Sequence, residues 1–373
     1  MILEETDRNF LVGAVRDFAR TRLNQLTERP ELPASRPAMD STLAELSALG
    51  VISEDEPAGF GIWDDLADRQ SCQLSANLLG ELAEVSPAVA IEVSNRALAG
   101  AFGRRGEVTE TGSVTFDASV GGGGRITGRS LVSEPPTADV PLLTDLWGRP
   151  ALRPRLHIGD PDWSMLWWPE WSESSGWQLR GVPRADCQVT ELPRGHGFDE
   201  SVFQHVALGA EAVFVEHLAL GPAEVIDGFT CHGIGLVAIS IATARRAVDR
   251  AREYSRNRRQ GGALIGEHDA VAELLANSEN SIAAAAAMLE GVLALEAGID
   301  RLHLLWRTRA EVQPLLSRAG SDALQVFGGI GYMRDVGPER DQRDLNSLRR
   351  LGGSPTELTL RCAALDDHKR SSR

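Results

Sequence analysis

The sequence predicts an α+β protein in which a region of short strands lies between two helical regions. In the first hundred residues, apolar side chains such as Phe10, Ala14 and Phe18 recur at helical spacing. The pattern then changes to prolines, a run of four glycines and short alternating stretches, and helical spacing returns after Gly221. We therefore predict an N-terminal helical domain, a middle β-domain and a C-terminal helical bundle, at residues 1–110, 111–220 and 221–373.

The N-terminal domain is predicted to contain helices and no strand before about Gly112. Leu43, Leu46 and Leu49 form an apolar helical face that ends at Gly50. Two further helices are predicted at residues 74–85 and 88–99.

The middle domain contains four strand candidates, and five of the eight tryptophans lie between Trp163 and Trp177. We expect these aromatic side chains to pack a small β-barrel, with the alternative that one of them covers a planar ligand ring. The strand candidates are residues 114–117, 125–128, 164–167 and 211–215.

The C-terminal domain is predicted to be a four-helix bundle, with long helical segments at residues 234–256, 269–297 and 300–327. The run Ala283–Ala287 permits close helix packing, and Pro314 is expected to mark a boundary or a kink.

Composition excludes several classes of function. The net charge of −15 argues against a broad nucleic-acid-binding surface. The four cysteines include no C-x-x-C pair, which argues against a zinc site and a disulfide scaffold and favours a reducing compartment. The acidic N-terminus is unlike a signal peptide, and no apolar run reaches the length of a membrane span. We expect a cytoplasmic protein that binds neither nucleic acid nor membrane.

The most informative motif is QVFGGIGY at residues 325–332. Its glycines let the backbone approach another group closely. Two Arg–acid pairs, Glu339-Arg340 and Arg343-Asp344, follow it, and the turn Gly352-Gly353-Ser354 comes next. Such a surface suits a phosphate- or flavin-sized ligand.

This order of motifs resembles the C-terminal domain of the acyl-CoA dehydrogenases, and YSRNRRQGGALI at residues 254–265 resembles a second segment of that family. The resemblance implies the family's three-domain fold and FAD as cofactor. It also implies that Arg258 contacts the flavin pyrophosphate of a neighbouring subunit, where its planar fork suits an anion. The alternative for Arg258 is a solvated charge in a basic run. The other implied FAD-binding residues are Gln325, Gly328, Gly329, Gly353 and Ser354.

The family's usual catalytic Glu falls on Gly352, which cannot act as a base. Some members carry the Glu on the long helix instead, at a position that corresponds to His232. Histidine titrates near neutrality and could serve as acid or base, but a buried histidine with a structural role is the competing interpretation. The next residue, Gly233, stands where the family usually has an Arg that anchors CoA.

Three hypotheses follow. In the first, the chain is a subunit of a flavin-dependent acyl-CoA dehydrogenase that lacks the catalytic Glu, as in the actinobacterial heterotetramers, and completes the FAD site of a second, dehydrogenase-like subunit. Its substrate would be a bulky acyl-CoA in lipid or steroid catabolism, and its electron acceptor an electron-transfer flavoprotein. In the second, it is a homo-oligomer that acts on a carrier-protein or CoA thioester in secondary metabolism, with His232 as acid/base. In the third, it is a cofactor-free scaffold.

Overall fold

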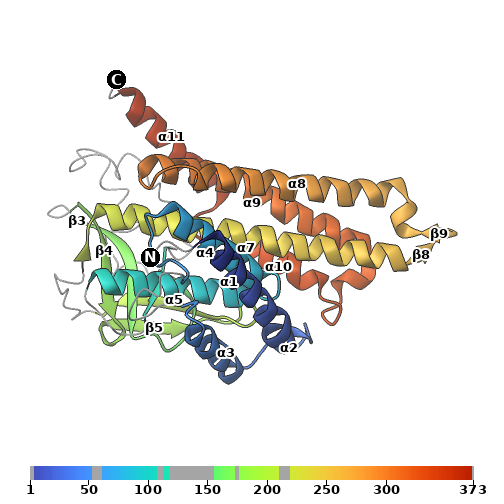
Figure 1. The fold of residues 1–373 in the computed structure, drawn as a ribbon, viewed down its shortest axis with the longest axis horizontal. Coiled ribbons are helices and arrows are strands. Elements are labelled where there is room, and N and C mark those ends of the chain that lie inside the picture. Colours follow the sequence, from blue (N-terminus) through green and yellow to red (C-terminus); the bar gives the residue numbers. More distant parts are fainter. Residues whose placement is uncertain are drawn as a thin grey trace.

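The computed structural model describes residues 4–52, 61–106, 112–116, 155–172, 176–209 and 219–371. Long helices lie side by side along the molecule, with the strands of the middle region at one end and a short hairpin at residues 259–264 at the other (Figure 1). This arrangement confirms the predicted α+β fold class. The strand candidates at 125–128 and 211–215 lie outside the described residues, and the domain boundaries at 110 and 220 stay predictions.

Side-chain caps and a glycine set several ends of the N-terminal helices. The side chain of Asp68 accepts a hydrogen bond from the Ser71 N–H and caps α4, and Ser86 caps α5 in the same way through Val89. Gly50, at φ 74°, lets the chain leave the helix before it, as the sequence predicts. The helices are α1 (Glu5–Phe18), a π-helical turn (Ala19–Leu23), α2 (Asn24–Thr27), α3 (Arg36–Ala48), α4 (Arg69–Ala83) and α5 (Pro87–Arg105).

The described strands of the middle region form two sheets, ordered β1-β3-β4-β7 and β2-β6-β5. Only the β1–β3 pairing within these sheets is parallel. Trp163, Leu166 and Trp168 pack against Val206 between the sheets, so these aromatic side chains serve packing. The strands are β1 (Gly112–Val114), β2 (Arg155–Gly159), β3 (Met165–Ser172), β4 (Gly176–Pro183), β5 (Cys187–Glu191), β6 (Val202–Leu208) and β7 (Ala219–Leu220).

The C-terminal helices form the bundle that the sequence predicts. Pro314 lies inside α9, which continues on both sides of it, so the expected helix boundary is wrong. Packing of α9 against its neighbours offsets the single backbone hydrogen bond that proline removes. The elements are α7 (Pro222–Asn257), a hairpin of β8 (Arg259–Gln260) and β9 (Ala263–Leu264), α8 (Asp269–Leu293), α9 (Ile299–Phe327), α10 (Pro338–Leu348) and α11 (Pro355–Ser371).

Helix α7 runs through the middle of the molecule in Figure 1. It is long and apolar enough to cross a membrane, but 89% of its most apolar stretch is buried inside the protein. It therefore serves as the central core helix of the bundle.

The two Arg–acid pairs of the sequence motif join the bundle to the middle region. Arg340 donates a hydrogen bond to Glu200, and both side chains are buried. Arg343 holds both carboxylate oxygens of Asp199, each at 2.8 Å. Asp344 accepts the Phe198 N–H at 2.7 Å, and burial raises the pKa of its carboxyl to about 6. The expectation that these pairs border a ligand surface is therefore wrong, because their partners lie in the segment between β5 and β6.

Candidate functional site

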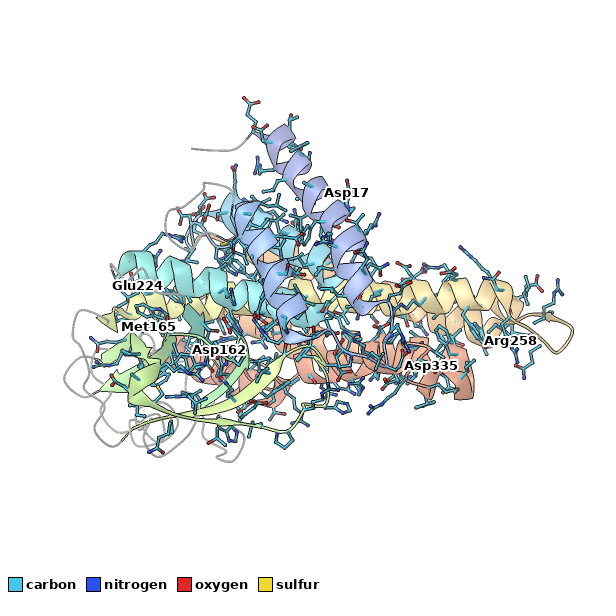
Figure 2. All side chains as sticks on the ribbon, turned by 90° about the horizontal axis from the view of Figure 1, so that it is seen from below. Asp17, Asp162, Met165, Glu224, Arg258 and Asp335 are labelled. Atoms are coloured by element: carbon cyan, nitrogen blue, oxygen red, sulfur yellow. The ribbon has the colours of Figure 1, made fainter. Side chains whose placement is uncertain are left out.

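The residues predicted to bind the cofactor fall into two groups on different parts of the bundle. We call Arg258, Gln325, Gly328 and Gly329 the Arg258 end, and residues 351–354 the Gly352 turn. The turn lies against His232, which precedes Arg258 by 26 positions on α7, or about 39 Å of helix. Figure 2 shows Arg258 at the opposite end of the molecule from Glu224, which lies in the first turn of α7. One chain therefore does not bring both groups to the same ligand.

The Arg258 end is organised by a stack between the rings of Tyr254 and Phe327, whose centroids are 4.5 Å apart. The stack joins the last turn of α7 to the last turn of α9. The Arg258 N–H donates to the Tyr254 carbonyl at 2.9 Å, and the Arg258 carbonyl accepts from the Ile265 N–H at 2.8 Å. The Arg258 side chain is exposed. It makes no hydrogen bond or ion pair with the rest of the described chain, so its guanidinium is available to an anion on another molecule.

The glycines at this end leave room beside the backbone. Gly328 ends α9 at φ 61°, a conformation that favours glycine, and added Cβ atoms at Gly328 and Gly329 would meet nothing within 4 Å. Three large apolar side chains close by are exposed, at 43% for Ile330, 67% for Tyr332 and 53% for Met333. Neighbouring exposed apolar residues mark contact surfaces more often than isolated ones do. The end therefore suits contact with a second chain.

The Gly352 turn, in contrast, is held from inside by this chain. Gly352 has φ 63°, and its carbonyl accepts a hydrogen bond from Arg309 Nη1 at 3.1 Å. Arg309 Nη2 also donates to the Leu351 carbonyl. Arg361 Nη1 donates to the Gly352 carbonyl at 3.4 Å, and its guanidinium lies 5.5 Å from the ring centroid of Trp306. Two buried cations therefore fix the turn.

Ser354, predicted to approach a flavin, caps a helix. Its Oγ donates to Glu357 Oε2 at 2.7 Å, and the Ser354 N–H donates to the same oxygen at 2.7 Å. These bonds satisfy the first turn of α11. The hydroxyl is therefore already used within the chain.

The space beside Gly352 is filled. An added Cβ would lie 3.0 Å from Arg309 Nη1, 3.2 Å from Leu236 Cδ1 and 3.3 Å from His232 Cδ2. The fold thus brings together the two positions, 232 and 352, at which the sequence placed the family's base. Neither position carries a carboxylate, and the packing leaves no room for one at 352.

His232 lies in an apolar and cationic environment. Its ring centroid is 5.2 Å from that of Phe116, and its Nε2 is buried without a hydrogen-bond partner in the described chain. Burial, and secondarily the charge of Arg309, lower its pKa to about 3. The imidazole is neutral near pH 7 and holds a proton weakly. A role as general base stays a prediction that this environment disfavours.

Sequence reasoning missed Arg309 and Arg361. The available signal was that Arg309 follows Trp306 by three residues and so shares the apolar face of its helix, where a charge needs a specific partner. Its partners are the backbone carbonyls of a turn 42 and 43 residues further along the chain, which no local pattern indicates.

Folding stability should fall in acid because His232 is buried neutral. The folded pKa of about 3 lies below the ordinary 6.5, so the stabilisation is complete above pH 6.5 and is lost as pH falls towards 3. From pH 7 to pH 5 this histidine alone should cost about 2 kcal/mol. Urea unfolding at the two pH values should show a loss smaller by that amount in His232→Leu than in wild type.

His157 and Asp344 do not affect this comparison, because they are present in both proteins. Burial lowers the pKa of His157 to about 4, so it adds to the acid loss. Asp344, with its pKa raised to about 6, acts in the opposite direction. Equal losses in wild type and His232→Leu would show that His232 is not buried in its neutral form.

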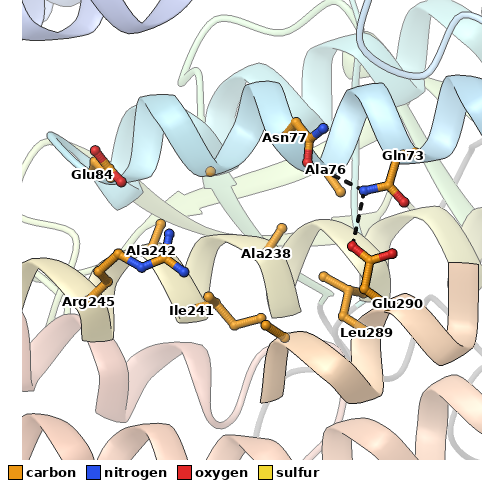
Figure 3. Close-up of a pocket in the computed structure, with 12 residues that line it drawn as sticks. Gln73, Ala76, Asn77, Glu84, Ala238, Ile241, Ala242, Arg245, Leu289 and Glu290 are labelled. Carbon is orange, nitrogen blue, oxygen red and sulfur yellow. Dashed lines mark hydrogen bonds between the residues drawn. The ribbon is translucent and has the colours of Figure 1, made fainter. Parts of the chain in front are cut away.

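A separate pocket of about 170 Å³ lies between α4, α7 and α8. Figure 3 shows Gln73 Nε2 hydrogen-bonded to Asn77 Oδ1 and Glu290 Oε1, both at 3.4 Å, above an alanine-lined floor. The α7 residues that line the pocket include Ala238 and Ala242, on a different face of the helix from His232 and Leu236. The pocket therefore does not connect the Gly352 turn to solvent.

Comparison with known proteins agrees with this architecture. Residues 223–363 match the family described as acyl-CoA dehydrogenase, C-terminal domain. The chain is 25% identical over 185 residues to 3-sulfinopropanoyl-CoA desulfinase of Paraburkholderia xenovorans, covering 50% of this chain and 45% of the desulfinase. It thus spans about half the length of that relative.

Two solved structures share the fold over almost the whole chain. Butyryl-CoA dehydrogenase of Megasphaera elsdenii has a TM-score of 0.72 at 16% identity and covers 98% of this chain, with 100% of its own length matched. The prolyl acyl carrier protein oxidase AnaB has a TM-score of 0.70 at 14% identity, with 97% of this chain and 99% of the oxidase covered.

The chain therefore has the acyl-CoA dehydrogenase fold, and residues 223–363 match the C-terminal domain of that family. The predicted resemblance is confirmed. The sequence resemblance implies FAD as the cofactor. The Arg258 end and the Gly352 turn differ in how well they could bind that cofactor. The Arg258 end is open and cationic, whereas the Gly352 turn is packed with this chain's own side chains.

Proposed function

We propose that the chain is the partner subunit of a two-chain acyl-CoA dehydrogenase, supplying the Arg258 end to FAD held mainly by a second chain. The observation that carries this proposal is the Gly352 turn. The position of the usual base is a glycine, two arginines clamp the turn, and the surrounding space is filled. The Arg258 end remains open, and a site completed by another chain would use it.

The chemistry divides between the chains. Dehydrogenation of an acyl-CoA removes the proton α to the thioester, for which the second chain would provide the base, and FAD would supply the hydride acceptor when bound. This chain would bind and orient the cofactor. Arg258 would hold the pyrophosphate with paired charge-assisted hydrogen bonds, the exposed amide of Gln325 would add one more, and the Gly328-Gly329 backbone would allow close approach.

Arg258→Ala should reduce FAD retention by the assembly at least tenfold. Each charge-assisted hydrogen bond between Arg258 and the pyrophosphate is worth about 1.5–3 kcal/mol at most. The exposed Arg258 side chain has no partner within the described chain, so no interaction inside this chain offsets the loss of those bonds. The measurement is flavin absorbance per chain after gel filtration, with this chain coexpressed with a dehydrogenase-like partner chain.

Arg259→Ala is the matched control, because Arg259 is the neighbouring exposed arginine in the same basic run. It should leave retention within about twofold, since no family position assigns it to the pyrophosphate. Equal losses in both variants would favour a general charge effect. Unchanged flavin in Arg258→Ala would remove Arg258 from the site.

A second candidate is a homo-oligomeric flavoprotein that acts on a CoA or carrier-protein thioester with His232 as acid/base. The contact between His232 and Gly352 favours it, and the fold likeness to a carrier-protein oxidase is compatible with it. Native mass and absorbance separate the possibilities. A yellow homo-oligomer without partner supports the second candidate, and a colourless protein even with the partner supports a cofactor-free scaffold.

A further inference from the structure

Two cysteines distant in sequence meet in the core, away from the Arg258 end. Cys72 lies in the second turn of α4 and Cys231 in α7, and both are fully buried. The two thiols donate to the same oxygen, the Leu66 carbonyl, at 3.4 Å from the Cys72 sulfur and 3.5 Å from the Cys231 sulfur. Their sulfurs are therefore close neighbours across the contact between α4 and α7.

A buried cation faces this pair. The side chain of Arg301, near the start of α9, is 0% exposed, and none of its three guanidinium nitrogens has a hydrogen-bond partner in the described chain. Its charge acts on the Cys72 sulfur. A buried guanidinium without an opposite charge is strongly unfavourable, and a negative charge on that sulfur would supply one.

The other charged groups around the pair are acidic. Asp227 also faces Arg301, but it lies 3.6 Å from Arg105, and burial raises the pKa of its carboxyl. Asp68, the N-cap of α4, opposes a charge on Cys72. Cys72 itself lies near the N-terminus of α4, where the helix favours an anion.

The four thiols differ in the direction of their pKa shifts. The hydrogen bond with Cys231 and the charge of Arg301 lower the pKa of Cys72. Burial raises the pKa of Cys231. Burial also raises the pKa of Cys187 to about 12 and that of Cys362 to about 11. Cys72 is thus the thiol best suited to attack an electrophile, with Cys231 as its resolving partner.

We propose that Cys72 and Cys231 are a redox-active dithiol that a hydroperoxide converts to a disulfide between α4 and α7. The Cys72 thiolate attacks the peroxide and breaks the O–O bond, giving a sulfenic acid and, after protonation, an alcohol or water. The Cys231 sulfur then attacks the sulfenic sulfur, and water leaves. In sum, two thiols and one hydroperoxide give one disulfide, one alcohol or water, and one water, with two electrons passing to the peroxide.

The test uses the reduced full-length chain and hydrogen peroxide. After the reaction, the protein is denatured in iodoacetamide, digested without reductant and mapped by mass spectrometry. The expected product is a peptide pair joined through Cys72 and Cys231, formed at least about tenfold faster than Cys362 is oxidised. Cys362 is the internal control because it too is buried. Dithiothreitol should restore both thiols.

Substitutions of single residues test which cysteine performs each step and whether Arg301 promotes the first one. Cys231→Ser should leave a Cys72 sulfenic acid that dimedone traps, whereas Cys362→Ser should form the wild-type crosslink. Arg301→Met should slow oxidation at least about tenfold. Should that variant fail to fold, the wild-type rate still decides: between pH 6.5 and 8 it should rise less steeply with pH than the rate of an ordinary thiol, which gains about tenfold per pH unit below its pKa. Recovery of both cysteines as alkylated thiols, or faster oxidation of Cys362, would overturn the proposal.

Discussion

Replacing Glu200 by Ala should lower the free energy of unfolding by about 3–5 kcal/mol, because the change leaves Arg340 buried without its carboxylate partner. The side chains of Glu200 and Arg340 are 1% and 5% exposed, so water cannot replace the lost interaction. The pair joins α10 to the segment between β5 and β6. The measurement is urea unfolding followed by circular dichroism.

Asp199→Ala provides a matched comparison from the neighbouring residue. Its partner Arg343 is more exposed and keeps Glu339, whose Oε2 lies 2.7 Å from Nε, so the loss should be about 1 kcal/mol. A double replacement, Glu200→Leu with Arg340→Met, should recover part of the stability because the two buried charges are removed together. A loss below about 1 kcal/mol in Glu200→Ala would contradict the role of this network.

Gly352→Ala should cost about 2–5 kcal/mol of folding free energy. The left-handed backbone at φ 63° accounts for about 1–2 kcal/mol, and overpacking against Arg309, Leu236 and His232 accounts for about 1–3 kcal/mol. The same crowding should prevent Gly352→Glu from restoring a productive base. The free energy of unfolding of the purified chain measures the first effect.

Gly261→Ala is the matched control, because Gly261 has the same φ of 63° but its added Cβ would meet only His268, at 3.7 Å. It should show the backbone cost of about 1–2 kcal/mol without the packing cost. Equal losses at the two positions would mean that the space beside Gly352 is not filled.

The sequence predicted the order of helices and strands well, because apolar spacing and glycine punctuation are local signals. The helix expected at residues 300–327 is α9, from Ile299 to Phe327, and Gly50 follows α3 as expected. A helix boundary at Pro314, one of the two expected outcomes, was wrong because the cost of one missing hydrogen bond is local, whereas the packing that offsets it comes from other helices.

The candidate site was only partly predictable. Motif spacing identified Arg258 and Gln325, which the structure leaves exposed at one end of the bundle. The Arg–acid pairs of the same motif were misassigned because Asp344 and Arg340 bond to Phe198 and Glu200, more than a hundred residues earlier in the chain. The two arginines at the Gly352 turn were missed for the same reason, since long-range partners leave no periodic pattern.

In our proposal, this chain completes another chain's site and supplies no base of its own. The most direct test is the turnover of His232→Ala in the assembly with the partner chain, with flavin content and native mass measured in parallel. Our account predicts a rate within about threefold of wild type, because the change removes no transition-state contact. A fall of about 10²–10⁴ with flavin and assembly intact would make His232 the base and contradict the account.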